Sequence, residues 1–298
     1  MPNEVFEITE KAVTKFQEGV GATQNGIIKK INGTLKKLEI DSQGNVKVNQ
    51  ANLRILRTLR EDLVKIIINP AYKKKLETYL LNFNRIKRVD DEYFKSIKLP
   101  NFNPNRQAYR EILNGNIGIT RASLTESGII NEVVMPVVKL LEQGITTGIA
   151  FDDLEAALRL EIIGGTTPET SAPPRLGRFE RYTKQITRDA LNQYSRNYVA
   201  TISNEYEMEW YFYDGSNIND TREFCRKRSG KYWHKKEVES WSSERWNGKI
   251  PSTTRTSIFI YAGGYSCRHS IDPVLLDVVP KSVIQRNIRN KNYNPPST

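Results

Sequence analysis

Three short segments decide the fold of the C-terminal part of this chain: Asp220-Thr-Arg-Glu-Phe-Cys225, Ser229-Gly-Lys-Tyr-Trp-His234 and Gly263-Gly-Tyr-Ser-Cys-Arg-His269. Both cysteines, both histidines and three of the four tryptophans of the chain lie between residues 220 and 273. Rare residue types gathered in one part of a chain indicate a small domain with a specific local structure. The preceding residues are typical of a helical scaffold that carries it.

The composition is that of a polar, helix-rich protein with room for two domains, at 298 residues and a mean hydropathy of −0.56. No run of about 18 apolar residues is present, so we expect no membrane span. The mixed, acidic start Met-Pro-Asn-Glu-Val-Phe-Glu argues against a secretory signal. Two cysteines are too few for a disulfide framework, so we expect reduced thiols and assembly in a cytoplasm.

The positive charge is concentrated near the C-terminus. The net charge is +11, and residues 215–298 hold 15 Lys and Arg against 7 Asp and Glu. A basic terminal domain suggests a polyanionic partner, with nucleic acid as the first candidate. The alternative is a surface on which scattered charges only maintain solubility.

Hydrophobic periodicity predicts a helical N-terminal half, because apolar residues recur three, four and seven positions apart. The first helix is either continuous or broken near Gly19–Gly26, and Pro136 marks a kink or the first turn of a new helix. We predict helices at residues 5–38, 50–69, 70–98, 119–141 and 151–163.

The segment 166–174 is rich in small residues and proline, which is typical of a linker. We therefore predict a helical N-terminal region at 1–165 and an α+β domain at 175–280. Residues 281–298 contain four basic and no acidic residues and predict a flexible tail. The fold class is mainly α, with a small α+β C-terminal domain.

The periodicity changes inside the C-terminal domain. A long linking helix is expected at 176–205, and the alternating aromatic run at 207–214 predicts a β-strand. We expect short helices from Asp220 or Thr221 to Arg228 and at 235–241, a second strand at 257–261, and a tight turn at Gly263–Gly264. The small sheet would carry the cysteine and histidine segments.

Four side chains of the C-terminal domain are candidate metal ligands: Cys225, His234, Cys267 and His269. Four nitrogen or sulfur ligands suit a structural zinc site, although no CxxC or HxxxH pair is present. The alternative is that the cysteines are small core residues and that His269 is a hydrogen-bonded core residue. We expect no cofactor other than this possible zinc ion, and a Cys225–Cys267 disulfide only in an oxidising medium.

No catalytic constellation is evident, so we expect no enzyme activity. A Cys–His nucleophile needs a third group to orient the imidazole, and none can be named near Cys267 and His269. The sequence has no GxSxG, P-loop or GxGxxG pattern.

Residues 175–275 resemble the C-terminal domain of phage Mu F-like minor head proteins, the head morphogenesis family. The resemblance rests on the long helix, the aromatic strand ending at Asp214, Arg222–Cys225, and the terminal Cys267-Arg-His269. The chain departs from the family where many members have His-Pro before the final cysteine, since it has Gly264-Tyr265-Ser266. Residues 233–255 are also peculiar to this chain.

This resemblance implies a structural role inside the virion of a tailed bacteriophage. Such proteins are few-copy components that associate with the portal or the inner capsid during head assembly in the host cytoplasm and sit beside packaged double-stranded DNA. The expected partners are therefore a portal protein, a major capsid protein and DNA, with the N-terminal region docking to the protein shell.

Contact with DNA would use phosphates and not base edges. The candidate phosphate contacts are Arg222, Arg226, Lys227, Arg228, Lys231, Arg255 and Arg268. One alternative is a free-standing nucleic-acid-binding protein without sequence preference. Another is a nuclease or toxin-type enzyme that uses His234, His269 or a glutamate.

Overall fold

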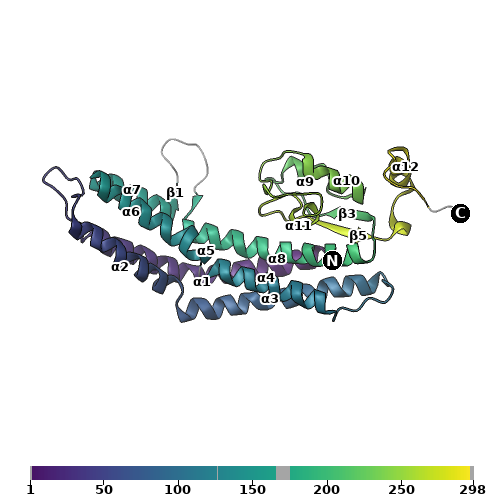
Figure 1. The fold of residues 1–298 in the computed structure, drawn as a ribbon, viewed down its shortest axis with the longest axis horizontal. Coiled ribbons are helices and arrows are strands. Elements are labelled where there is room, and N and C mark those ends of the chain that lie inside the picture. Colours follow the sequence, from purple (N-terminus) through teal and green to yellow (C-terminus); the bar gives the residue numbers. More distant parts are fainter. Residues whose placement is uncertain (1, 126, 166–174, 296–298) are drawn as a thin grey trace. The chain divides into compact units, whose positions relative to one another are not determined.

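The computed structural model describes residues 2–125, 127–165 and 175–295. Figure 1 shows a mainly helical chain with two small antiparallel sheets, which confirms the predicted fold class. The elements are α1 Pro2–Leu35, α2 Gln50–Ile67, α3 Pro70–Ser96, α4 Gln107–Leu124, α5 Ser127–Ile129, a π-helical segment Ile130–Val134, α6 Met135–Thr147, α7 Phe151–Ile163, β1 Gly164–Gly165, β2 Arg175–Leu176, α8 Arg178–Glu205, β3 Trp210–Asp214, α9 Glu223–Arg226, β4 Lys231–His234, α10 Lys235–Ser240, a 3-10 turn Trp241–Ser243, α11 Ile258–Tyr261, β5 Ser270–Val274, a 3-10 turn Leu276–Val278 and α12 Lys281–Arg289.

The chain divides into two units whose segments alternate along the sequence. The helical unit comprises Ala12–Leu80 and Gly118–Thr187. The sheet unit comprises Met1–Lys11, Leu81–Ile117 and Arg188–Thr298. The division predicted at 166–174 does not coincide with this boundary, because α1, α3, α4 and α8 each contribute residues to both units. The predicted linker itself lies outside the described residues.

Helices α2 and α3 begin where the sequence supplies caps. The side chain of Asn49 accepts a hydrogen bond from the backbone N–H of Asn52 at 2.8 Å, and that of Asn69 accepts one from Tyr72 at 2.9 Å. Pro70 is the first residue of α3, where a missing N–H needs no partner. The predicted starts of both helices are confirmed.

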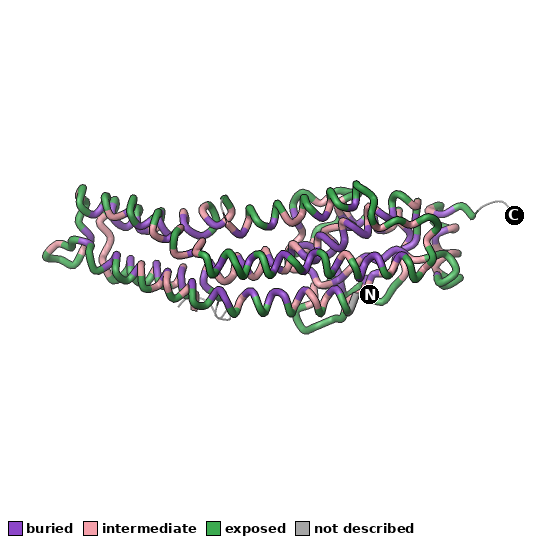
Figure 2. The backbone as a smooth tube through the Cα atoms, turned by 90° about the horizontal axis from the view of Figure 1, so that it is seen from below, coloured by how far each residue is buried: buried purple, intermediate pink, exposed green. Residues whose placement is uncertain are grey.

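The core of the helical unit lies along the buried faces of its helices, which alternate with exposed faces in Figure 2. The Phe16 ring packs against Tyr72 at 5.6 Å and Tyr79 at 5.5 Å between centroids. The two tyrosine hydroxyls donate to the backbone carbonyls of Leu124 at 2.8 Å and Thr187 at 2.6 Å. Large aromatic side chains are thus buried without leaving their hydroxyls unpaired.

The helix predicted at 119–141 is divided among α4, the short α5, the π-helical segment Ile130–Val134 and α6. Helix α4 begins earlier, at Gln107, and ends at Leu124. Helix α6 begins at Met135 after a π-helical segment, with Pro136 in its first turn. Pro136 lies in the first turn of α6, but Val134 before it is also helical, so α6 continues the π-helical segment and no separate helix begins at Pro136.

The sheet unit contains a three-stranded antiparallel sheet of order β4-β3-β5. Its two faces have separate cores, because successive side chains of β3 point to opposite sides. Tyr211 and Tyr213 pack with the residues of α9 and α11 on one face. Trp210 packs on the other face with Tyr293 and residues of α12.

Two predictions for the C-terminal part are wrong. Residues 258–261 form helix α11 and not a strand, because Ile258 and Phe259 are both buried against the sheet and not alternately exposed. The tail predicted to be flexible contains helix α12, because Val283, Ile284 and Ile288 pack against the Trp210 face. Residues 296–298 of that tail lie outside the described residues.

None of the helices among the described residues combines the length and the apolar composition that a bilayer crossing requires.

Candidate metal centre

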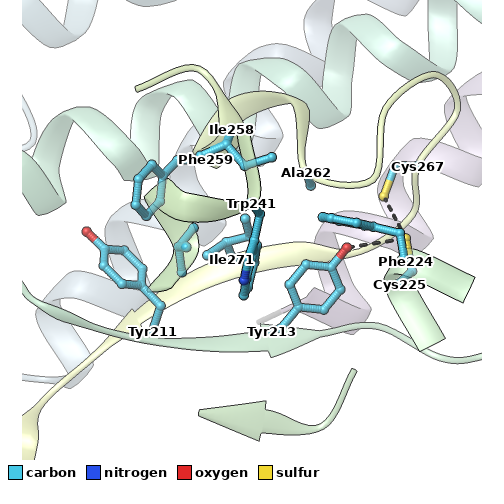
Figure 3. Close-up of a cluster of buried hydrophobic side chains, with 11 residues drawn as sticks. Tyr211, Tyr213, Phe224, Cys225, Trp241, Ile258, Phe259, Ala262, Cys267 and Ile271 are labelled. Carbon is cyan, nitrogen blue, oxygen red and sulfur yellow. Dashed lines mark hydrogen bonds between the residues drawn. The ribbon is translucent and has the colours of Figure 1, made fainter. Parts of the chain in front are cut away.

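Cys225, Cys267 and His269 come together beside the sheet. Cys225 belongs to α9, Cys267 ends the loop after α11, and His269 precedes β5. The two sulfur atoms lie 4.0 Å apart, and Sγ of Cys267 lies 4.0 Å from Nδ1 of His269. All three side chains are buried, and their ligand atoms lie within 4.8 Å of one another. Figure 3 shows the two cysteines meeting next to Phe224 and Tyr213.

One face of α8 holds the loop that carries Cys267. Asp189 accepts a hydrogen bond from the backbone N–H of Ser266 at 2.7 Å, and Arg196 donates to the carbonyl of Cys267 at 2.6 Å. Asn192, between them on the helix, donates to the same carbonyl at 3.5 Å. These three residues are three and four positions apart, so they share one side of the helix.

Glycines make room for the three side chains. A Cβ atom on Gly263 would lie 2.3 Å from Sγ of Cys225 and 2.9 Å from Sγ of Cys267. A Cβ on Gly215 would lie 2.6 Å from Cδ2 of His269. Both positions therefore exclude larger residues.

The loop that carries Cys267 begins and ends in strained backbone. Ala262 and Ser266 have φ values of 46° and 54°, a region that residues with a Cβ rarely adopt. Such conformations persist only where the surrounding contacts enforce them, and they are concentrated at functional sites.

Hydrogen bonding separates the pKa values of the two thiols. The hydrogen bond from Cys225 lowers the pKa of Cys267 well below its usual range, and His269 and the Arg196 guanidinium lower it further, although burial acts against them. The same bond and burial raise the pKa of Cys225. The Cys267 sulfur also accepts the N–H of Gly263 at 3.3 Å. Cys267 is therefore the thiol that ionises first.

A cavity of about 300 Å³ opens at the three side chains. Cys225, Cys267 and His269 line it together with three arginines, Arg188, Arg222 and Arg268. Arg188 and Arg268 lie near the carboxylate of Glu10, at 2.8 and 3.8 Å. Arg222 donates to the carbonyl of Tyr265 at 2.7 Å and has no carboxylate partner within the described part of the chain. Three arginines against Glu10 and Asp220 leave the surroundings of the cavity with an excess of positive charge.

The structure does not bring His234 to this group. Its ring packs against Trp210 and Tyr293, on the opposite face of the sheet. His234 pairs with Trp210 at one end of β3, while Ser270 pairs with Asp214 at the other. Four residue steps along a strand are roughly 13 Å. His234 instead caps α10, where its Nδ1 accepts the N–H of Lys236 at 3.3 Å.

The seven candidate phosphate contacts differ in exposure. Four are exposed, namely Arg226, Lys227, Lys231 and Arg255, and two, Arg222 and Arg268, are half-buried. Arg228 is buried; its guanidinium stacks on the rings of Phe224 and Trp241 and pairs with Glu244 at 2.5 Å. Arg228 therefore belongs to the core and is unavailable to a phosphate.

Sequence reasoning missed several residues that support the centre. Tyr213, which donates its hydroxyl to Sγ of Cys225 at 3.3 Å, was recognisable only as part of an aromatic strand. The contacts of Asp189 and Arg196 span 77 and 71 positions, which no local pattern reveals. Gly263 could be noticed in the sequence, because the pair Gly263–Gly264 comes shortly before Cys267. The pair predicted only a turn and not a contact with the cysteines.

Comparison with known proteins yields no match to this chain among protein-family models, curated proteins or solved structures.

Proposed function

We propose that this chain is a structural minor head protein of a tailed bacteriophage. It acts inside the virion, at the portal or the inner capsid, assists head assembly and contacts packaged DNA without sequence preference. The observation that supports the proposal best is the 4.0 Å approach of Cys225 and Cys267. The family resemblance rests in part on the segments that carry these two cysteines, and 42 positions separate them in the sequence.

The exposed basic residues support the contact with DNA. Arg226, Lys227 and Lys231 lie on or near α9 and β4 of the sheet unit, and Arg255 lies in the loop before α11. Arg226 and Lys231 donate to backbone carbonyls, and Lys227 lies 3.5 Å from the exposed Glu223. An exposed ion pair of this kind is weak and is readily exchanged for a phosphate.

The helical residues before 166 would provide the contact with the protein shell. Their helices bury one face and expose the other, so they present long polar surfaces with apolar side chains at intervals. Ile119 and Leu81 are examples, with 70% and 59% of their surface exposed. Surfaces of this mixed kind suit a protein–protein contact.

Co-assembly tests the proposal directly. The tagged chain is expressed together with the portal and major capsid proteins of the same phage, and the assembled particles are separated by sedimentation. We expect the chain to sediment with portal-containing particles in a few copies each. Particles of normal composition that never contain the chain contradict a role in the head.

The same preparation separates the alternatives. A free-standing nucleic-acid-binding protein binds DNA but does not sediment with the particles. An enzyme shows turnover of a nucleic acid or cofactor that is lost in His269→Ala and kept in His234→Ala.

A further inference from the structure

We infer that Cys225, Cys267 and His269 bind one zinc ion whose fourth coordination position opens into the arginine-lined cavity and takes an anionic oxygen ligand. This inference concerns the chemistry of the sheet unit and does not depend on the proposed role in the phage head.

The spacing of the three ligand atoms fits a tetrahedral ion. Two sulfurs at 2.3 Å from one zinc ion lie about 3.8 Å apart, and a sulfur and a nitrogen lie about 3.6 Å apart. The measured separations are 4.0 Å between the sulfurs and 4.0 Å between Sγ of Cys267 and Nδ1 of His269. The third pair, Sγ of Cys225 and the ligand nitrogen of His269, lies within 4.8 Å. The two sulfurs therefore need to approach by only a few tenths of an ångström, and His269 must approach Cys225 by up to about 1 Å to complete the tetrahedral geometry.

The donor set selects the kind of metal. Two thiolates and an imidazole are soft and borderline ligands that favour zinc over magnesium or calcium. Hydrogen bonds from the N–H of Gly263 and the hydroxyl of Tyr213 already point at the two sulfurs. Such donors stabilise negative charge on metal-bound sulfur.

His269 has a suitable environment on both ring nitrogens. Nδ1 faces Cys267, while Nε2 is buried without a hydrogen-bond partner in the described structure. His269 also lines a second cavity of about 20 Å³, together with Asp90 and Asp272, and Oδ2 of Asp90 is likewise unpartnered. That volume holds about one water molecule. A water there would accept the Nε2 proton and donate to the carboxylate, which orients His269 for binding through Nδ1.

The fourth position has room and positive charge for an anion. Zinc with two thiolates is electrically neutral, and Arg188, Arg222 and Arg268 line the adjoining cavity. Asp220 lines the same cavity but is exposed and is not among the residues whose ligand atoms come together. An anionic oxygen from phosphate or carboxylate therefore fits the open position better than a fourth ligand from the described residues.

Metal analysis of the full-length reduced protein tests the ion. We expect about one zinc ion per chain after purification in zinc-containing buffer. Cobalt that replaces the zinc should give the intense visible bands of a tetrahedral site with sulfur ligands. Folded wild-type protein that retains no zinc and gives no such bands overturns the inference.

Matched histidine variants locate the ion. His269→Ala should reduce the zinc content to a small fraction, while His234→Ala, which removes the other buried histidine of the same unit, should keep it. Equal zinc contents in the two variants overturn the assignment. Because either variant can impair folding, the wild-type cobalt spectrum is also followed during removal of the metal by a chelator and its return.

Anion titration of the cobalt protein tests the open position. Inorganic phosphate and acetate are added separately at constant ionic strength, and we expect at least one of them to shift the visible bands saturably. The response to one and not the other identifies the anion class. Bands that respond to neither anion in wild type, but do respond in Asp220→Asn, show that Asp220 closes the site and contradict the open position.

Discussion

The hydroxyl of Tyr213 donates a hydrogen bond to Sγ of Cys225 across 3.3 Å. Tyr213 is fully buried and belongs to the central strand of the sheet, while Cys225 belongs to α9. The bond therefore joins the sheet to the cysteine cluster. A substitution that removes this bond should therefore affect both the stability of the sheet and the environment of the cysteines.

Tyr213→Phe should separate this bond from general packing. The variant keeps the ring and loses the donor, so we expect a loss of about 1 kcal/mol in the free energy of unfolding together with weaker metal binding. Denaturant unfolding and competition with a chelator measure the two effects. The control is Tyr211→Phe on the same strand, which loses a hydroxyl that donates to the carbonyl of Met208, just before β3. If both variants weaken metal binding equally, the Tyr213–Cys225 bond has no special role.

Gly263→Ala should disrupt the candidate metal centre through a steric clash with the cysteines. The new Cβ would lie 2.3 and 2.9 Å from the two sulfurs, so one or both cysteines must move. We expect a loss of roughly 1–3 kcal/mol in stability and of bound metal. Gly115→Ala is the matched control, because a Cβ there meets nothing within 4 Å in helix α4 and alanine is the better helix former. Thermal unfolding of both variants measures the loss of stability. If Gly263→Ala is as stable as Gly115→Ala, the close approach of residue 263 to the two sulfurs is wrong.

The pH dependence of stability should reveal the buried carboxylate of Asp272. Burial raises the pKa of Asp272 to about 7, with a further upward contribution from Asp214 and a downward one from its bond with Ser270. The folded state therefore holds its proton more tightly than the unfolded state, so stability is lost as the pH rises from about 4 to about 7. Each pKa unit corresponds to about 1.4 kcal/mol, which gives an effect of a few kcal/mol at most.

Asp272→Asn should flatten this dependence. The amide cannot ionise, so the variant should lose less unfolding free energy than wild type between pH 5 and pH 8. Some slope should remain, because burial also raises the pKa of Asp90 and that of Asp189, the latter to about 6. Denaturant unfolding of both proteins at pH 5 and pH 8 measures this loss of free energy. If wild type and Asp272→Asn lose the same amount, Asp272 does not cause the pH dependence.

Two sets of arginine and lysine variants should separate folding from DNA binding. Joint replacement of Arg226, Lys227, Lys231 and Arg255 by glutamine should keep stability within about 0.5 kcal/mol of wild type. It should reduce the dependence of DNA affinity on salt by up to about 0.9 per phosphate contact that is lost. Filter binding at several salt concentrations measures the slope. An unchanged slope shows that these residues do not contact the phosphates.

Arg228→Ala should reduce the stability of the protein and leave the salt dependence of DNA binding unchanged. Its loss leaves Phe224 and Trp241 without their stacked guanidinium and leaves Glu244 unpaired. We expect a loss of a few kcal/mol in stability because a buried arginine also contributes its packing. If Arg228→Ala is as stable as wild type and weakens DNA binding alone, its interpretation as a core residue is wrong.

The predictable parts of the fold are those that local patterns determine. Asn49 and Asn69-Pro70 mark helix starts by capping chemistry, and the aromatic alternation before Asp214 marks β3. The residues of α11 were wrongly predicted as a strand, because an apolar stretch of that length fits a strand or a buried helix turn equally well. Helix α12 was missed because its charged and polar residues outnumber its apolar ones, while the three apolar residues decide its packing.

The candidate site was predictable only in its residue types. Rare cysteines and histidines pointed to the right segments, yet sequence spacing could not show that His234 lies on the other face of the sheet. The partners of Cys267 on α8 depend on tertiary packing across more than 70 positions. Burial of Arg228 likewise depends on rings brought over it by the fold.

X-ray absorption at the zinc edge of the purified, reduced protein tests the central claim most directly. The account predicts two sulfur neighbours at about 2.3 Å and two nitrogen or oxygen neighbours at about 2.0–2.1 Å, one of which changes when the added anion changes. A zinc ion without sulfur neighbours, or folded protein that binds no zinc at all, contradicts it.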